Sequence, residues 1–451
     1  MAKVIRKHWV SDVSTGIARR DRRSCDYEAY LPDTLADREI VLSSEAAADV
    51  ADAERAIAVL DAQAKTLVDT ETLARILLRA ESVASSRIEG LEVGARRLLR
   101  AEAAVELGEE PSDVTAAEVL GNIDAMATAI RSISPGEPIT MNLLLDFHHR
   151  LLSGTRLEAH AGAIRVEQNW IGGSSYNPCS AAFVPPPPEH VTDLLDDLCH
   201  FCNTDQIPAV AQAAIAHAQF ETIHPFVDGN GRTGRALIQL VLRRRGLATR
   251  VMPPVSLVLA TWADDYVLGL DATRYRGPAT STTARDGINL WIGRFAAACG
   301  QAVADAASFE ESAVQLQETW RARLGPVRAN SAADVLLRTL PGMPIMTVPS
   351  AARLIDRSFT AVNGGMAKLC EAGIVRQVNV GRRNRAFEAP EVIDAFTALE
   401  RQLASLGRAG AGGSGASRPR SRQVNAARAE GPSTARSLRL GPRGRWAGRS
   451  A

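Results

Sequence analysis

The stretch HPFVDGNGRTGR, residues 224–235, is the part of the sequence that decides the fold around it. Pro225 disfavours helical geometry in the residue before it, so the apolar helix that leads into the stretch ends there. Gly229 and Gly231 can adopt positive φ and turn their backbone N–H groups inward. A second helix begins at about Arg232, and its unpaired N–H groups point into the same loop. These features predict an anion cradle of the kind that holds phosphates.

Charged and ionisable side chains accompany this loop. Arg232 and Arg235 lie three apart on one side of the first helical turn, where each exposed cation opposes the helix dipole by roughly 0.3–1 kcal/mol. Two arginines beside a helix N-terminus suit a polyphosphate better than a single carboxylate. Asp228 suits Mg²⁺ that bridges phosphate oxygens, and His224 suits proton transfer near neutral pH. The alternative is a buried histidine beside a glycine-rich helix cap. No Walker lysine motif occurs, which excludes a P-loop.

The stretch resembles the signature of the Fic (Fic/Doc) family, H-P-F-x-D-G-N-G-R-x-G-R, at every fixed position. The resemblance extends over about 77–300 and, more loosely, to the C-terminal part of the chain. It implies a protein adenylyltransferase, which transfers AMP from ATP to a Ser, Thr or Tyr hydroxyl of a target protein. ATP would be the substrate and Mg²⁺ the cofactor.

The resemblance also implies a role for each residue of the motif. His224 would be the general base that deprotonates the target hydroxyl, and Asp228 would hold Mg²⁺. Tyr266 resembles a tyrosine near the base or ribose, although Val267 stands where relatives often have a second tyrosine. The residues that would bind the nucleotide are Phe226, Gly229, Asn230, Gly231, Arg232, Arg235 and Tyr266.

An upstream segment, SSRIEG at residues 85–90, carries a second motif. Ser85 and Glu89 are four apart and share a helix face, and Gly90 allows the helix to end after the acid. The segment resembles the family's inhibitory motif, [ST]-x-x-x-E-[GN]. That resemblance implies that Glu89 pairs with Arg235 and withholds it from the γ-phosphate of ATP. The alternative is a solvated helix face. Because the same glutamate positions a water in some relatives, removal of AMP is also open.

The apolar segments around a glycine-rich connection predict a β-hairpin over 163–184. It resembles the family's flap, with Trp170, Ile171 and Gly172 as target-docking residues. An exposed strand edge could hold a target segment by β-augmentation and align its hydroxyl over His224. In the alternative interpretation, the two apolar side chains pack the core.

The fold class expected is mainly α: a Fic-type helical bundle with a β-hairpin flap, followed by a small winged helix-turn-helix domain. The expected divisions are an irregular segment at 1–45, a helical region with the inhibitory helix at 46–110, a catalytic core at 111–310, a winged helix at 326–406 and a disordered basic tail at 407–451. The winged helix has two open uses, DNA binding and protein binding. A different function is also open, that of a DNA-binding regulator with a vestigial core, although intact His224 and Asp228 count against it.

Composition limits the remaining partners and the compartment. The chain is 46% hydrophobic and 23% charged with a net charge of +1, as in a globular protein of no particular charged partner. It lacks a run of about 18 apolar residues, so no membrane span is expected. The six cysteines show no framework spacing, which favours a reducing, cytoplasmic location with Cys199 and Cys202 as a buried reduced pair. Self-association is open, since no stretch reveals an interface.

Overall fold

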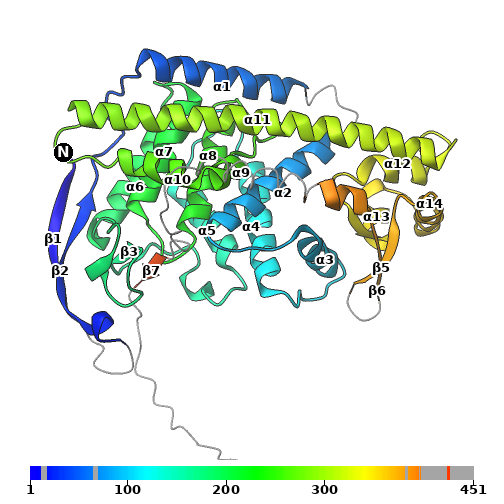
Figure 1. The fold of residues 1–451 in the computed structure, drawn as a ribbon, viewed down its shortest axis with the longest axis horizontal. Helices are drawn as coiled ribbons and strands as arrows, with labels where there is room; N and C mark the ends of the chain where they lie inside the picture. Colours follow the sequence, from blue (N-terminus) through cyan, green and yellow to red (C-terminus); the bar gives the residue numbers. More distant parts are fainter. Residues whose placement is uncertain (12–17, 64–69, 381–383, 396, 398–423, 427–451) are drawn as a thin grey trace, which may run out of the picture.

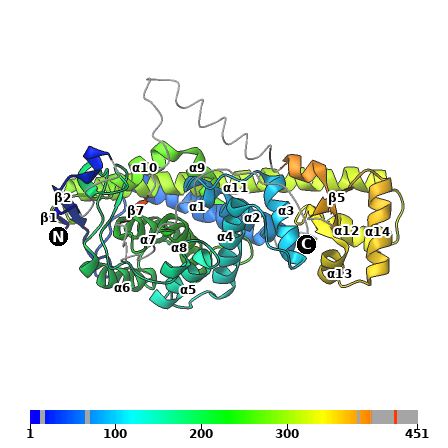
Figure 2. The same ribbon diagram turned by 90° about the horizontal axis from the view of Figure 1, so that it is seen from below.

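The computed structural model describes residues 1–11, 18–63, 70–380, 384–395, 397 and 424–426. The fold is mainly helical, as predicted (Figure 1). Helix α11 (Thr282–Leu324), roughly 65 Å long at 1.5 Å per residue, runs along the molecule from the N-terminal strands to the C-terminal helices (Figure 2). Helix α1 (Ser44–Gln63) packs beside it. In the described part of the chain, no helix combines the length and apolarity needed to cross a bilayer.

The centre of the molecule is α7 (Ala209–Ile223), which is buried along its whole length. Its sequence is mostly apolar or small, with four large polar residues that are also buried, as expected of a helix that is surrounded by others. It packs against α6 (Val191–Cys202), α8 (Asn230–Arg244) and α11. Because α7 and α8 are consecutive and both buried, the loop that joins them lies inside the core.

Further helices surround this pair. They are α2 (Thr70–Ile88), α3 (Ala95–Glu106), α4 (Val114–Arg131), α5 (Met141–Leu152), α9 (Val255–Thr261) and α10 (Ala263–Ala272). Two of them begin at a side chain that caps the first turn: Asp113 accepts from Ala116 N, and Thr140 accepts from Leu143 N. Such caps satisfy backbone donors that the helix itself leaves open.

The N-terminal segment 1–45 is not irregular, and that prediction is wrong. Strands β1 (Lys3–Trp9) and β2 (Cys25–Leu31) form an antiparallel hairpin, here called the N-terminal hairpin. A 3-10 turn, η1 (Arg19–Arg22), precedes β2. The sequence C-D-Y-E-A-Y-L of β2 alternates in burial over its first four residues, which is the period-two signal of a half-buried strand.

The predicted hairpin at 163–184, here called the flap, is only partly regular. Its single strand β3 (Asn169–Ile171) makes a bridge to Phe183, and the turn η3 (Pro178–Ser180) interrupts the return. Strand β3 also pairs with β7 (Val424–Ala426). These three residues fall in the predicted disordered tail and contradict it, while the rest of 407–451 lies outside the described residues.

The C-terminal unit follows the predicted order of helices and a two-stranded hairpin, with one additional strand. Its elements are α12 (Ala332–Thr339), β4 (Ile345–Thr347), α13 (Val348–Ile355), α14 (Phe359–Glu371), β5 (Arg376–Val380) and β6 (Asn384–Glu388), with sheet order β4-β6-β5. Gly365 of α14 lies against α12, where a Cβ would be 3.1 Å from Ala333 N. The glycine therefore permits close helix packing. The assignment as a winged helix stays a prediction.

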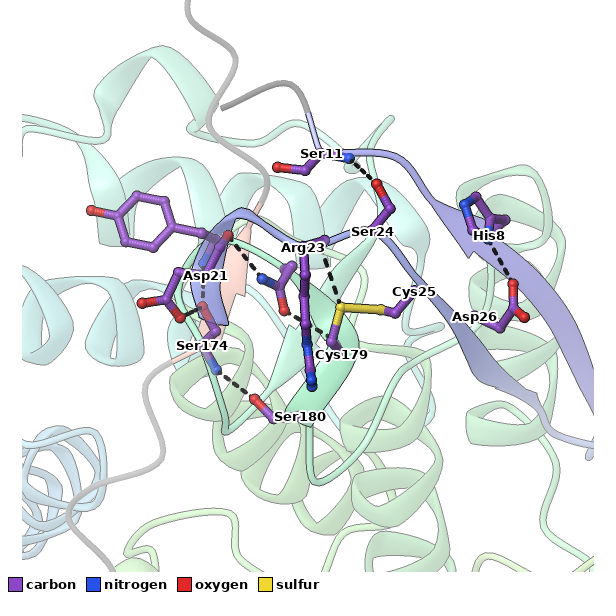
Figure 3. Close-up of a disulfide and its surroundings, with 12 residues drawn as sticks. His8, Ser11, Asp21, Arg23, Ser24, Cys25, Asp26, Ser174, Cys179 and Ser180 are labelled. Carbon is purple, nitrogen blue, oxygen red and sulfur yellow. Dashed lines mark hydrogen bonds and ion pairs between the residues drawn. A yellow bond between two sulfur atoms is a disulfide. The ribbon is translucent and has the colours of Figure 1, made fainter. Parts of the chain in front are cut away.

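A disulfide joins Cys25 of β2 to Cys179 of η3 (Figure 3). The expectation that all six cysteines are reduced is therefore wrong for this pair. The two residues are 154 apart in sequence, so no local spacing could have indicated the bond. Cys199 and Cys202 are free and buried, as predicted.

Candidate active site

His224 ends α7 with a backbone conformation that is unusual for its residue type. Its φ of 51° and ψ of 61° are left-handed, a region that costs a residue with a side chain on the order of 1 kcal/mol. Its carbonyl oxygen accepts from Arg165 Nε at 2.8 Å and from Asn169 Nδ2 at 3.2 Å. Donors outside the helix thus hold the peptide of His224 in place.

The ring of His224 is buried and presents one open nitrogen. Nδ1 lies 3.4 Å from the carbonyl oxygen of Glu221, which can only accept, so Nδ1 carries the proton. Nε2 then has a lone pair and has no hydrogen-bond partner. Burial, reinforced by the charge of Arg165, lowers the pKa of His224 to about 3. The imidazole is therefore neutral at pH 7 and can accept a proton on Nε2.

Arg165 is a buried arginine that sequence reasoning missed. Besides His224, its guanidinium donates to three further carbonyls: Ile223 O at 3.3 Å, Pro186 O at 2.6 Å and Glu167 O at 3.0 Å. Burial lowers its pKa to about 10, so it is still charged at neutral pH. This single side chain ties the end of α7 to the flap.

The loop between α7 and α8 is closed by side chains from within and from α5. Asn230 accepts from Phe226 N and donates to Phe226 O, each at 2.8 Å. Phe226 is buried, and its ring stacks on His148 at 3.7 Å. His148 Nδ1 accepts from Gly162 N, so its Nε2 donates to Asp228 O at 3.0 Å. The side chain of Asn230 therefore shapes the loop, and His148 is a supporting residue that the motif did not reveal.

Anion-binding groups gather where α8 begins. Gly229, with φ of 78°, is the N-cap, and the first-turn N–H groups after it have no partner within the helix. The side chain of Arg232 is 5% exposed, yet its Nε has no hydrogen-bond partner. Its NH2 lies 3.4 Å from Oδ1 of Asp228, whose side chain is 45% exposed. An unpaired buried guanidinium N–H beside open backbone donors suits a phosphate.

Arg235 lies deeper and is engaged by α2. Its Nε donates to Ser85 Oγ at 2.9 Å, and its NH2 donates to Ser85 O at 2.8 Å and to Glu89 Oε1 at 2.7 Å. Gly231 makes this contact feasible, because a Cβ on it would overlap Glu89 Oε1. The structure thus brings together the two motifs, which are 146 residues apart at the Glu89–Arg235 pair.

Two further residues, both missed by sequence reasoning, fix α2 in this position. Asn122 of α4 donates to Ser82 O at 2.9 Å and to Ser86 Oγ at 3.1 Å. The carboxylate of Glu81 accepts from Ser256 N at 2.8 Å and from Ser256 Oγ at 2.6 Å. Burial raises the pKa of Glu81 to about 7. Polar contacts of this kind depend on tertiary packing and leave no signal in a local pattern.

The remaining candidate residues lie apart from the loop or face the interior. Tyr266 is buried, with its hydroxyl 2.8 Å from His217 Nε2, so it packs the core beneath Arg235. In the flap, Trp170 is fully buried, Ile171 is 7% exposed, and Gly172 has a φ of 76°. Trp170 contacts the N-terminal hairpin, which is the packing role that the sequence left open for it.

Comparison with known proteins finds similarity to one family over part of the chain. Residues 138–242 match the Fic/DOC family model, and residues 47–131 match the model of that family's N-terminal region. The chain is 35% identical over 133 residues to protein adenylyltransferase fic-1 of Caenorhabditis elegans, covering 29% of this chain and 23% of that protein. It is 34% identical over 139 residues to protein adenylyltransferase Fic of Drosophila grimshawi, covering 30% and 27%. The chain spans about a quarter of the length of these curated relatives.

Solved structures with a similar course of the chain include two Fic proteins. A Fic family protein from Desulfovibrio desulfuricans G20 has a TM-score of 0.48 and 20% identity, over 78% of this chain and 98% of that chain. Residues 134–508 of Fic-1 from C. elegans have a TM-score of 0.43 and 23% identity, over 59% and 74%.

Proposed function

We propose that this chain, a member of the Fic/DOC family, is a protein adenylyltransferase restrained by its own Glu89. It transfers AMP from ATP to a Ser, Thr or Tyr hydroxyl of a target protein. The observation that carries the proposal is a neutral His224 with an unpartnered Nε2 beside an anion cradle whose second arginine, Arg235, is already engaged by Glu89.

His224 is the general base of this reaction. As the target hydroxyl oxygen attacks the α-phosphorus of ATP, its proton passes to Nε2, and the bond from that phosphorus to the bridging oxygen of the β-phosphate breaks. Pyrophosphate leaves, and AMP stays on the target oxygen. The negative charge of bound ATP raises the pKa of His224 above its value of about 3 and makes it a stronger base.

The phosphates are held by the start of α8. The N–H groups of Asn230 and Gly231 and the open Nε of Arg232 suit the negative oxygens, and Phe226 anchors the loop. The N–H of Gly229, which donates to Asp228 Oδ1, belongs to the same cradle. Asp228 fits Mg²⁺, since this ion takes one or two protein carboxylates together with substrate phosphates, and its chemistry is to neutralise phosphate charge. Among the described residues, no group of three His, Cys, Asp or Glu side chains is placed to hold a metal ion.

Glu89 restrains transfer by occupying Arg235. A γ-phosphate that cannot reach this guanidinium leaves the α-phosphorus badly posed for attack. Ser85 supports the restraint, because it accepts from the same guanidinium. Removal of AMP, with Glu89 positioning a water, belongs to the same proposal.

Further parts of the proposal concern partners. The flap docks the target segment, with Ile171 and Gly172 in the docking strand and Trp170 as its buried anchor, and Tyr266 supports the nucleotide site from the core. The unit at 326–406 contacts DNA or protein, and residues 381–383, between β5 and β6, lie outside the described residues. A cytoplasmic location without membrane contact, and self-association, stay predictions.

The test is label transfer from α-³²P-ATP with Mg²⁺ to the full chain. We expect weak self-labelling of the wild type, strong labelling of Glu89→Gly, and none of Glu89→Gly combined with His224→Ala. Glu92→Gly, at an exposed acid three residues further on, is the matched control and should resemble the wild type. Label from γ-³²P-ATP should not be retained, because the γ-phosphate leaves with pyrophosphate. If Glu89→Gly takes no label from any nucleotide, the transferase proposal fails.

A further inference from the structure

The inference concerns how the flap is held, and it rests on the proposed function because the flap is the target-docking element of that function. Between residues 172 and 180 the flap has no strand, and its own hydrogen bonds are local, such as Ser174 N to Ser180 Oγ at 3.3 Å and Cys179 N to Asn177 Oδ1 at 3.1 Å. Gly172 and Gly173 both have positive φ, and glycine loses more conformational freedom on ordering than any other residue. The adjoining strand β3 is only three residues long.

The N-terminal hairpin supplies the restraints that this segment lacks (Figure 3). Asp21 accepts from Ser174 Oγ at 2.6 Å with its carboxylate and from Asn177 Nδ2 at 2.9 Å with its carbonyl. The disulfide from Cys25 to Cys179 adds a covalent bond at the same end of the flap. These contacts fix the outer end of the flap from one side.

The inner end of the flap is held by packing and by the motif loop. Trp9 of β1 meets Trp170 edge to face, with ring centres 5.3 Å apart. Tyr30 N donates to Val184 O at 2.9 Å. Next to Trp170, Asn169 donates to His224 O and to Phe226 O. A displacement of the flap is therefore a displacement of the surface beside His224.

We propose that the Cys25–Cys179 disulfide positions the flap for the target segment, so that its reduction by a dithiol weakens target docking while leaving ATP binding intact. We expect target docking and ATP binding to respond differently because the groups responsible lie in different parts of the molecule. ATP is held by the start of α8, whose loop is closed by Asn230 and His148, and neither of these contacts the N-terminal hairpin.

A small dithiol can reach the Cys25–Cys179 disulfide from the solvent. Both half-cystines are half-buried and not enclosed. A thiolate of the dithiol attacks one sulfur and releases the other cysteine, which takes a proton. The second thiol then attacks the mixed disulfide and leaves as part of a cyclic disulfide, so the protein gains two electrons and two protons.

The other four cysteines are free thiols, and none of them forms a disulfide that a reductant could break. Cys199, Cys202 and Cys299 are free and buried, and burial raises the pKa of each thiol, to about 12 for Cys199. Thiols of raised pKa form little thiolate and react slowly. Cys370, on α14, is half-buried and free, and it serves as the matched control.

The experiment compares the oxidised full chain, the same chain after dithiothreitol, and the variants Cys25→Ser, Cys179→Ser and Cys370→Ser. Mass spectrometry after alkylation verifies which cysteines are reduced. Amide hydrogen exchange over 169–184 measures the order of the flap. We expect exchange there to rise about tenfold or more on reduction and in both variants of the pair, and to stay unchanged in Cys370→Ser.

Transfer activity is measured with the Glu89→Gly enzyme. The acceptor is an inactive copy of the chain that carries His224→Ala and Cys25→Ser. Because this copy lacks the Cys25–Cys179 disulfide, the reductant cannot change the acceptor through that bond. We expect the KM for this acceptor to rise about fivefold or more on reduction of the enzyme, with the ATP dissociation constant within about twofold. The ATP dissociation constant is measured by titration calorimetry in the absence of the acceptor, so that no transfer to it occurs.

The outcomes separate the two proposals. Unchanged exchange over 169–184 after verified reduction overturns the positioning role. Faster exchange with an unchanged acceptor KM overturns it too, because the bond then stabilises the fold without affecting docking. Transfer that is absent in every redox state refutes the proposed function, while the exchange measurement still decides whether the disulfide orders the flap.

Discussion

Replacing Arg165 by methionine should lower both stability and rate, because this side chain holds the strained peptide of His224. Arg165 is 3% exposed and donates to four carbonyl oxygens. Methionine has a similar length but no donor. It would leave Ile223 O and Pro186 O without this donor, whereas His224 O keeps its bond from Asn169.

The magnitude follows from two opposing effects. Each bond from a charged donor to a buried acceptor contributes about 1.5–3 kcal/mol. Methionine also removes a buried charge, whose cost is visible in a pKa lowered from 12.5 to about 10, or about 3 kcal/mol. Four lost bonds, about 6–12 kcal/mol together, outweigh this relief, and we expect a net loss of at least about 3 kcal/mol in the free energy of unfolding.

The rate should fall as well, since the left-handed conformation of His224 loses one of its two restraints. A misplacement of a reacting group by about 1 Å costs on the order of 100-fold in rate. In the Glu89→Gly background we therefore expect kcat for self-labelling to fall about 10- to 100-fold. Urea unfolding followed by tryptophan fluorescence measures the stability.

A matched control is Arg55→Met on α1, where the arginine is exposed and pairs with Asp52 across one turn. Exposed pairs of this kind contribute about 0.5 kcal/mol or less. The reasoning would be refuted if Arg165→Met, like the control, changed stability by less than about 1 kcal/mol and left the rate within about threefold.

Two further substitutions and one truncation test other contacts. Burial raises the folded-state pKa of Glu81 to about 7 from 4.5, so its protonated form favours folding, and the contribution is lost as pH rises through 7. The melting temperature should be higher at pH 6 than at pH 8, with a smaller difference in Glu81→Gln. Gly234→Ala places a Cβ 2.8 Å from Glu221 Oε1 and should destabilise by about 1–3 kcal/mol in urea, while Gly94→Ala, with nothing within 4 Å, should not. Truncation after residue 406 removes β7, frees the edge of β3 and should lower the KM for a separate protein acceptor.

Local chemistry explains what the sequence could predict. Helix α7 ends where Pro225 requires it to end. The loop after it could be anticipated because glycine at 229 can adopt the positive φ of a turn, which costs residues with a side chain free energy. The contact between Glu89 and Arg235 was inferred from the family resemblance, since nothing in the spacing of the two segments places them together.

The contacts that could not be predicted from the sequence depend on tertiary packing. The carbonyls that Arg165 binds come from three segments of the chain, and no local pattern places them near one another. Cys25 and Cys179 are joined only because β2 lies along the flap. The N-terminal strands did carry a signal, the alternation in β2, but a single hairpin of seven-residue strands is marginal without partners to pack on.

Three side chains hold the motif loop and the helix that follows it. They differ in whether a substrate group can replace them at the atom they bind. His148 and Arg165 bind backbone carbonyls, which no substrate replaces, so their contacts persist in every state of the reaction. Glu89 binds a guanidinium, and a phosphate can take the place of a carboxylate there. Glu89 is also 25% exposed, whereas Arg235 is 1% exposed. Substitution of Glu89 should therefore free Arg235 for a phosphate, and it should also lower the free energy of unfolding, because it leaves a buried guanidinium without its counter-charge.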